Sequence, residues 1–299
     1  MPNYKNIAIV GVGLIGGSIG LALRQRRLAA EIVGVGRRQE SLDRAIACGV
    51  IGSATTDLAA GVATADVVIV ATPVASVVDD VFRVLAAAPV GALVTDVGST
   101  KASICHSISE KQAISEKQAV PLQQAGSGQQ LDTSGFVGSH PLAGDHRSGP
   151  EHARGDLLEG KVVIVTPTSS TPSQTVARAQ AFWETLGAQV LQMPPEKHDQ
   201  ALATTSHLPH LVASALAALT PPEWLPLAAG GWADTTRVAA ADPLLWAQIF
   251  AQNTPAVIGA LDRLIEQLQT ARSSLLAEDR PEIENFLRQA KRTRDALGN

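Results

Sequence analysis

The chain has 299 residues, of which 45% are hydrophobic and 17% charged, and its formal net charge is −4 at pH 7. This length predicts about two domains, and the weakly negative charge gives no reason to expect a nucleic-acid partner. The two cysteines, Cys48 and Cys105, are too few for a disulfide framework and lack a metal-ligand spacing. No apolar run reaches the roughly 20 residues that cross a membrane. A strand pattern begins near residue 6, so we expect no signal peptide, no membrane partner and a reducing, cytoplasmic location.

The most informative local pattern lies within the first twenty residues. An apolar run, Ile7–Val10, leads directly into Gly11-x-Gly13-x-x-Gly16 and then into a segment with helical periodicity. In this setting the first glycine allows a tight turn, the second lets backbone approach a pyrophosphate, and the third allows close helix–strand packing. The amides at the helix start then hold the phosphates. We therefore predict a dinucleotide site formed by Gly11, Gly13, Leu14, Ile15 and Gly16.

Strand and helix patterns alternate through the first two thirds of the chain. Further apolar runs lie at 32–35, 67–71, 92–95, 162–166 and 189–193, with helical patterns at 41–48, 74–87 and 173–186. This alternation predicts an α/β fold, a Rossmann-type doubly wound parallel sheet. After Pro194-Pro195 only helical patterns remain, at 196–219, 254–276 and 281–297, and Pro209 should kink the first of them. We expect a dinucleotide-binding domain over 1–195 and an all-helical domain over 196–299.

One segment departs from this alternation. The hexapeptide ISEKQA at 108–113 is repeated at 114–119 and is followed by Gln-, Ser- and Gly-rich sequence up to Gly135. Such composition is typical of a surface insertion, part helix and part flexible loop. We place the insertion at about 105–135.

The end of the second strand bears on the choice of nucleotide. A site that prefers NAD usually has Asp or Glu there to hold the ribose 2′-hydroxyl. This chain has Gly36 followed by Arg37 and Arg38. Because a guanidinium can bind a 2′-phosphate, the sequence favours NADP over NAD. The alternative is a pair of solvated loop arginines.

Polar residues follow several of the predicted strands, where a doubly wound sheet binds its ligands. Thr72-Pro73 comes after the run at 67–71, and we expect it to contact the nicotinamide end of the cofactor. Ser99 follows the next strand, and we expect it to contact the cofactor as well. It could also be a helix N-cap, and the two roles are compatible. His140 lies in a predicted loop, where its near-neutral pKa suits a general base; taken alone, it is more often a turn residue.

Eight short motifs together resemble the prephenate/arogenate dehydrogenase family of tyrosine biosynthesis. They are GLIGGS at 13–18, ATPV at 71–74, DVGSTK at 96–101, SHPLAG at 139–144, TPT at 166–168, SHLPH at 206–210, DTTR at 234–237 and DPLLW at 242–246. The resemblance implies oxidative decarboxylation of prephenate with hydride transfer to NADP or NAD. It also implies that His140 accepts the proton of the C4 hydroxyl, that Ser99 binds the same hydroxyl and orients the histidine, and that Arg237 binds a substrate carboxylate.

The resemblance assigns further residues of the helical domain to the substrate. Ser206, His207 and His210 would line the cleft between the domains, and Trp246 resembles a tryptophan that reaches a partner's site. His207 and His210 lie at i and i+3, yet no HExxH pattern or cysteine cluster supports zinc, so we expect no metal. One histidine in a structural role, and plain helix packing for Trp246, are the alternatives.

One departure from the family concerns the choice of substrate. Many members have Thr-Glu after the SHPLAG motif, and the acidic side chain is linked to the substrate's side-chain end, whereas this chain has Asp145-His146. A carboxylate there favours the ammonium of arogenate and a cation disfavours it. The pair points in both directions, so we lean to prephenate and keep arogenate dehydrogenase as the alternative.

Two other functional hypotheses share the predicted architecture. A β-hydroxyacid-type dehydrogenase would typically use a lysine on the second domain's helix, where this chain offers Ser206, His207 and His210. A non-catalytic nucleotide sensor would not need His140, Ser99 and Arg237 together. The many Ala and Leu faces of the helical domain predict a homodimer.

Overall fold

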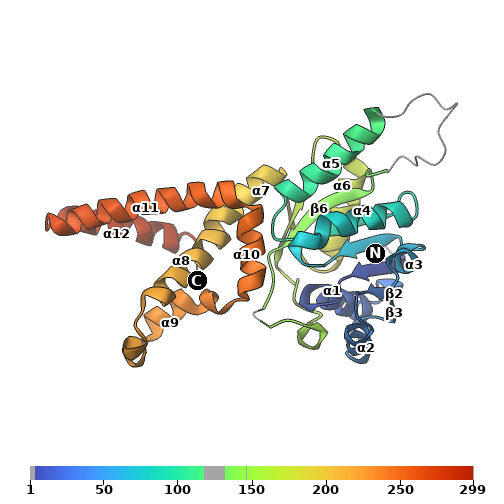
Figure 1. Cartoon of the computed structure of the whole chain (residues 1–299), viewed down its shortest axis with the longest axis horizontal. Helices are drawn as coiled ribbons and strands as arrows, with labels where there is room; N and C mark the ends of the chain where they lie inside the picture. Colours follow the sequence, from blue (N-terminus) through green and yellow to red (C-terminus); the bar gives the residue numbers. More distant parts are fainter. Residues whose placement is uncertain (1–3, 118–131, 146, 299) are drawn as a thin grey trace.

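The computed structural model describes residues 4–117, 132–145 and 147–298, in which a sheet-based half precedes a helical half (Figure 1). Over these residues the sheet has eight strands in the order β3-β2-β1-β4-β5-β6-β7-β8. The first three predicted apolar runs lie in β1, β2 and β4, and β1 pairs in parallel with both β2 and β4. The strands are β1 Tyr4–Val10, β2 Ala29–Val35, β3 Ser53–Thr55, β4 Val67–Val70, β5 Leu93–Asp96, β6 Phe136–Pro141, β7 Val162–Thr166 and β8 Gln189–Gln192.

Two strands were not predicted, and one of them changes the topology. Strand β3 is three residues long, too short for a clear apolar pattern. Strand β6 contains His140, which was expected in a loop, and pairs with β5 in parallel but with β7 in antiparallel register, His140 opposite Ile164. The sheet is therefore mostly parallel rather than wholly so.

Alternation along the strands builds a core on each face of the sheet. Ile7 and Ile9 belong to one buried cluster, and their neighbours Ala8 and Val10 belong to the other, as expected when successive side chains point to opposite faces. The first face is covered by α1 Leu14–Gln25, α2 Gln39–Ala47 and α6 Ser173–Thr185. The second is covered by α3 Leu58–Val62, α4 Val77–Ala87 and α5 Ala102–Lys117.

Part of the stretch assigned to the insertion at about 105–135 packs in the core. Ile104, Cys105 and Ile108 are at most 3% exposed and pack in the second cluster, so this part of α5 belongs to the core. The reason is its phase, since three apolar residues within one and a half turns face the sheet. Residues 118–131, which include the end of the second ISEKQA repeat, lie outside the described part.

The helical half begins with a helix interrupted by a wider turn. Helix α7 Pro195–Leu202 continues into a π-helical segment, η3 Ala203–His207, and then α8 Leu208–Leu219. Pro209 has no N–H for the carbonyl of Thr205, and its ring crowds that carbonyl, so the kink expected from Pro209 takes the form of a π turn before it. The remaining segments are η4 Pro222–Leu227, α9 Gly230–Thr236, η5 Arg237–Ala240, α10 Pro243–Gln252, α11 Thr254–Leu276 and α12 Arg280–Asp295.

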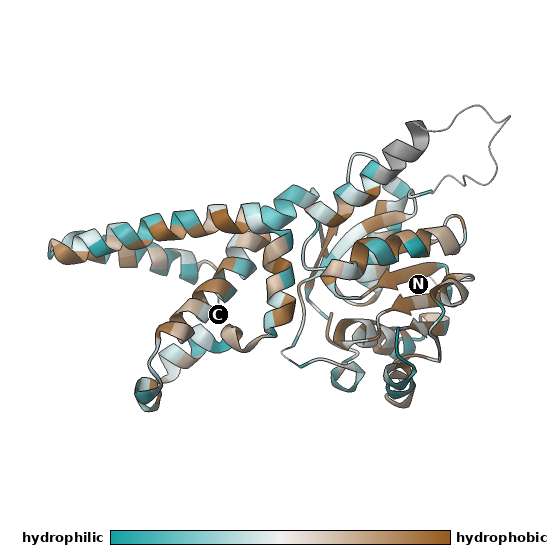
Figure 2. Ribbon diagram, in the orientation of Figure 1, coloured by the Kyte–Doolittle hydropathy of each residue, from teal (hydrophilic) through white to brown (hydrophobic). Residues whose placement is uncertain are grey.

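The last two helices form an arm that extends away from the rest of the chain (Figure 1). They pack on each other and carry brown, hydrophobic positions along their lengths (Figure 2). Leu268, Leu276 and Leu287 on this arm are 56%, 70% and 58% exposed. None of the described helices is both long enough and apolar enough to span a bilayer.

Candidate functional site

The loop between β1 and α1 is shaped by its glycines. Gly11 has φ +93°, and a methyl group there would lie 2.6 Å from the carbonyl oxygen of Ala71. A methyl on Gly16 would overlap the carbonyl oxygen of Gly11, whereas one on Gly13 would have nothing within 4 Å. Gly13 is thus free of packing constraints on the side where a ligand would approach.

The start of α1 fits an anionic ligand. Its N-cap, Gly13, has no side chain that could accept from the first amides, and the first turn has no acidic residue. The first amides of a helix need acceptors and sit at the positive end of its dipole. The residues present, including Leu14, Ile15 and Gly16, therefore fit the pyrophosphate of a dinucleotide.

Two arginines flank this loop at the end of β2. Arg37 and Arg38 are exposed, and within the described residues neither forms an ion pair. Arg38 is the N-cap residue of α2. A methyl on Gly36 would lie 3.0 Å from Leu42, so packing limits this position, where an NAD-type site has an acid.

The loops after β4 and β5 are joined by a residue of the helical half. Gln252 on α10 accepts a hydrogen bond from Thr100 Oγ1 at 2.5 Å and donates to the carbonyl of Val74 at 3.1 Å. Beside these contacts lie Ser99, which is partly buried, and Thr72, whose buried hydroxyl has no hydrogen-bond partner among the described residues. Pro73 is exposed. The predicted residues Thr72, Pro73 and Ser99 are therefore brought to one edge of the sheet.

The amides at the start of α5 are capped by Asp199 and not by Ser99. The amides of Lys101 and Ala102, at the start of α5, donate to the two carboxylate oxygens of Asp199 at 2.8 and 3.0 Å. A residue of α7 thus caps α5.

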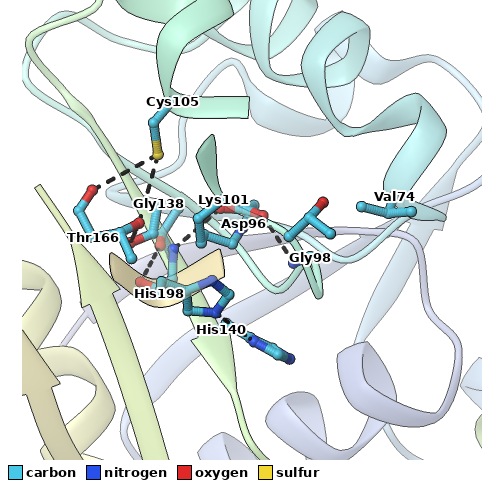
Figure 3. Close-up of polar contacts among 12 residues, drawn as sticks. Val74, Asp96, Gly98, Lys101, Cys105, Gly138, His140, Thr166 and His198 are labelled. Carbon is cyan, nitrogen blue, oxygen red and sulfur yellow. Dashed lines mark hydrogen bonds and ion pairs between the residues drawn. The ribbon is translucent and has the colours of Figure 1, made fainter. Parts of the chain in front are cut away.

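His140 is linked to a second histidine that sequence reasoning missed (Figure 3). Its Nδ1 lies 2.8 Å from Nε2 of His198, and Nδ1 of His198 lies 2.8 Å from Oδ1 of Asp199. His140 is partly buried, while His198 and Asp199 are 0% and 4% exposed. The two residues stand in the charged stretch EKHDQ, which is typical of a solvated helix surface, so only the adjacent His-Asp pair could have indicated them.

Burial keeps these histidines neutral. It lowers the pKa of His140 well below the ordinary value, and the nearby His198, Lys101 and His207 lower it further. Burial also lowers the pKa of His198, although the hydrogen bond to Asp199 opposes this change. Burial alone would raise the pKa of Asp199, but its hydrogen bonds from His198 and the two amides lower it overall. The arrangement is two neutral imidazoles beside an ionised carboxylate.

A buried ion pair is hydrogen-bonded to the strand that carries His140. Asp96 and Lys101 pair with each other, and both side chains are fully buried. The carboxylate of Asp96 also accepts from the amides of Gly98 at 2.8 Å and Ser139 at 3.1 Å. The hydroxyl of Ser139, in turn, accepts from Trp183 Nε1 at 3.0 Å. Figure 3 shows this pair close to His140 and His198. The residue before the candidate base is therefore fixed on both its backbone and its side chain.

The predicted residues of the helical half gather around Trp246. Its ring stacks on His210 of its own chain, with centroids 3.5 Å apart and an angle of 22°, and His207 meets it edge-on at 6.0 Å. Burial lowers the pKa of His210, and the charge of Arg237, which is exposed on η5, lowers it further. Ser206 is partly buried beside them.

His207 has a structural contact besides its predicted role. It is 1% exposed, and its Nδ1 lies 3.1 Å from Nδ2 of Asn253, which also donates to the carbonyl of Asp199 at 2.8 Å. Burial lowers the pKa of His207 to about 4. The assignment of His207 to the substrate stays a prediction, and its burial fits the alternative of a structural histidine.

The loop after His140 contains Asp145, one of the two residues that depart from the family's Thr-Glu. The carboxylate of Asp145 is bound by Arg147 through Nη2 at 2.8 Å and Nε at 3.1 Å. The same loop reaches α1, where the amide of Arg154 donates to Ser18 at 3.0 Å. His146 lies outside the described residues. Across the described part of the chain, no three His, Cys, Asp or Glu residues are grouped to hold a metal ion.

Comparison with known proteins places the chain among relatives that share both halves. Residues 19–192 match the prephenate dehydrogenase nucleotide-binding domain, and residues 194–289 match the prephenate dehydrogenase dimerization domain. A cyclohexadienyl dehydrogenase of Zymomonas mobilis is 30% identical over 99% of this chain and 97% of its own length.

Two solved structures have the same architecture. Prephenate dehydrogenase from A. aeolicus, in complex with hydroxyphenyl propionate and NAD+, has a TM-score of 0.85 and 30% identity over 98% of both chains. Arogenate dehydrogenase from Synechocystis has a TM-score of 0.79 and 28% identity, covering 98% of this chain and 100% of its own. The chain belongs to the prephenate dehydrogenase family.

Proposed function

We propose that this chain oxidatively decarboxylates prephenate to 4-hydroxyphenylpyruvate in tyrosine biosynthesis. In this reaction ring C4 loses a hydride while its hydroxyl gives its proton to a base, which leaves a C4 carbonyl. The electron pair of the bond to the ring carboxylate then enters the ring as CO2 leaves, and the C4 oxygen takes a proton back, so that the product is the aromatic phenol. The observation that carries the proposal is His140, a neutral and partly buried imidazole held on the same sheet as the dinucleotide loop.

The chain's own residues supply proton removal and positioning. When bound, an oxidised nicotinamide supplies the hydride acceptor. His140 accepts the proton of the C4 hydroxyl, a role typically worth about 10²–10⁴-fold in rate. Ser99 donates a hydrogen bond to the same oxygen. Arg237 binds a substrate carboxylate, and Ser206, His207, His210 and Trp246 form the wall beside it, an arrangement supported by the effect of Arg237 on the pKa of His210.

NADP is the favoured nucleotide and NAD the alternative. The support is the exposure of Arg37 and Arg38 at the end of β2 and the absence of an acid at Gly36. Charged hydrogen bonds are worth roughly 1.5–3 kcal/mol each. Arg38→Ala should therefore weaken NADP binding about tenfold or more and leave NAD binding within about twofold. An equal loss for both nucleotides would contradict the preference.

Prephenate is favoured over arogenate by the contact between Asp145 and Arg147. Because the guanidinium offsets the charge of the carboxylate, Asp145 offers little attraction to the ammonium of arogenate. We expect Asp145 to meet the side-chain end of the substrate. A clear preference for arogenate in the assay below would assign the chain to arogenate dehydrogenase.

Homodimerisation and a domain division at residue 195 complete the proposal. The exposed leucines of α11 and α12 support a partner chain on this arm. The proposed cytoplasmic location is supported by the two free cysteines, Cys48 and Cys105.

One set of assays tests the proposal. Prephenate and arogenate are each supplied with NAD and with NADP, and nicotinamide reduction is followed together with CO2 release. We expect reduction with prephenate, and His140→Asn should lose at least about 100-fold in kcat while keeping its nucleotide affinity. An unchanged rate in this variant would remove His140 from the mechanism, and no reduction with either substrate would overturn the proposed function.

A further inference from the structure

We propose that His198 and Asp199 are positioning residues that fix the tautomer of His140, so that Nδ1 of His140 carries hydrogen and Nε2 remains the base. This inference rests on the proposed function, because it concerns how His140 accepts a proton. It follows from the hydrogen bonds, taken outward from Asp199, with both imidazoles neutral as their burial dictates.

Two backbone amides show that both carboxylate oxygens of Asp199 are hydrogen-bond acceptors. Its Oδ1 accepts from the amide of Lys101 and its Oδ2 from that of Ala102, at 2.8 and 3.0 Å. A backbone N–H can only donate, so both oxygens act as acceptors. Since Oδ1 also lies 2.8 Å from Nδ1 of His198, that nitrogen must be the one that carries hydrogen.

The position of hydrogen on His198 determines its position on His140. A neutral imidazole has one N–H and one acceptor nitrogen, so a hydrogen on Nδ1 of His198 leaves its Nε2 as an acceptor. This Nε2 lies 2.8 Å from Nδ1 of His140, which must then be the donor. The lone pair of His140 is therefore on Nε2, on the opposite side of its ring from His198.

The positioning residues and the base belong to different halves of the molecule. His140 lies on β6 of the sheet half, whereas His198 and Asp199 lie on α7 of the helical half. The carbonyl of Asp199 is also held by Asn253, at 2.8 Å. Thus the caps of α5 and the tautomer of His140 depend on the carboxylate of Asp199, and its backbone carbonyl helps to hold α7 in place.

Asp199→Asn removes the acceptor-only group that fixes the tautomer and is the main test. An amide oxygen in the place of Oδ1 would still accept from His198 and would turn the NH2 toward the amide of Ala102, whereas an NH2 in the place of Oδ1 would face the amide of Lys101, donate to His198 and move hydrogen to Nε2 of both histidines. Because the carboxylate allows one tautomer and the amide allows both, the imidazole signals of His140 in ¹⁵N-labelled protein should gain an Nε2–H component that the parent lacks. We expect kcat with prephenate to fall by about tenfold or more, with nucleotide affinity within about twofold of the parent. An unchanged Nδ1–H pattern with a parent-like kcat would show that the carboxylate does not fix the tautomer.

The chain offers a matched control. Glu196→Gln makes the same change of carboxylate to amide on α7 and alters another polar contact between α7 and α5, the hydrogen bond of Glu196 with His106. This variant should keep the parent's kcat and imidazole pattern. Equal loss in Glu196→Gln and Asp199→Asn would mean that helix seating alone matters, and it would overturn the proposal.

His198→Gln and His198→Leu separate polarity from packing and cover the case in which Asp199→Asn does not fold. Glutamine can donate to Asp199 and accept from His140, so it should keep the Nδ1–H pattern and a rate within about tenfold of the parent. Leucine should lose both. The Nε2–H pattern in the parent protein would refute the tautomer assignment even if prephenate is turned over, whereas the Nδ1–H pattern without turnover would contradict the proposed function and leave this assignment in place.

Discussion

Alanine substitution at two glycines of the dinucleotide loop should separate folding from binding. Gly13 and Gly16 stand three residues apart at the start of α1, and only their surroundings differ. A methyl on Gly13 meets nothing within 4 Å, whereas a methyl on Gly16 overlaps the Gly11 carbonyl oxygen and lies 3.0 Å from Ile9 Cγ2. The same substitution therefore tests two separate functions of the motif.

The expected magnitudes follow from these contacts. Gly13→Ala should leave the free energy of unfolding within about 1 kcal/mol of the parent, because the methyl enters open space and the unfolded chain loses entropy. It should weaken nucleotide binding by about 10–100-fold, since the methyl keeps the pyrophosphate from the amides and charged hydrogen bonds are worth roughly 1.5–3 kcal/mol each. Gly16→Ala should cost about 3 kcal/mol of stability or more, because the obstacle is backbone.

Urea unfolding without nucleotide and calorimetric titration with NADP+ and NAD+ measure the two effects. We expect a stable Gly13→Ala protein that binds nucleotide poorly and a Gly16→Ala protein that unfolds at a lower urea concentration than the parent. Unaltered affinity in the first variant would show that the loop does not hold the pyrophosphate. Parent-like unfolding in the second would show that the close packing at Gly16 is not needed.

Three further expectations follow from the buried charges and rings. Lys101→Met should lower the free energy of unfolding by about 3–5 kcal/mol, because Asp96 would stay buried without its ion pair; a loss below about 1 kcal/mol in urea would contradict this. The pKa of His207 is about 4 when folded and 6.5 ordinarily, so the unfolded state binds more protons between these values. Stability should accordingly fall by about 3 kcal/mol from pH 7.5 to pH 4, and unfolding curves with no such acid loss in the parent relative to His207→Asn would refute it. Trp246→Ala removes the ring stacked on His210 and should raise KM for prephenate about 2–10-fold with kcat nearly unchanged, whereas an unaltered KM would remove Trp246 from the substrate wall.

The main architecture could be predicted because the chain's local patterns agree with its tertiary structure. Each apolar run that was taken as a strand is one, and the glycine motif lies between β1 and α1 as expected. The strand β6 was missed because Gly138, Ser139 and Pro141 are poor strand formers. These residues are tolerated there because the strand is fixed by side chains of other elements, Asp96 and Trp183 among them.

The base in the candidate site could be proposed from the sequence, but its supporting residues could not. His140 lies in a motif that carries the family resemblance, whereas His198 and Asp199 lie in a polar stretch with no periodic apolar pattern. Their burial arises from contact between α7 and the start of α5, which are about a hundred residues apart in the chain. Such a long-range contact leaves no local signal, because neither segment alone contains its partner.

Gln252 bonds to two loops of the sheet half at once, through a carbonyl oxygen on one side and an amide nitrogen on the other. The spacing between those loops is thus dictated by a helix that follows both of them by more than a hundred and forty residues. Efforts to widen the range of accepted ring compounds should accordingly vary α10 together with the loop residues. While Gln252 on α10 binds both loops, it continues to fix the distance between them.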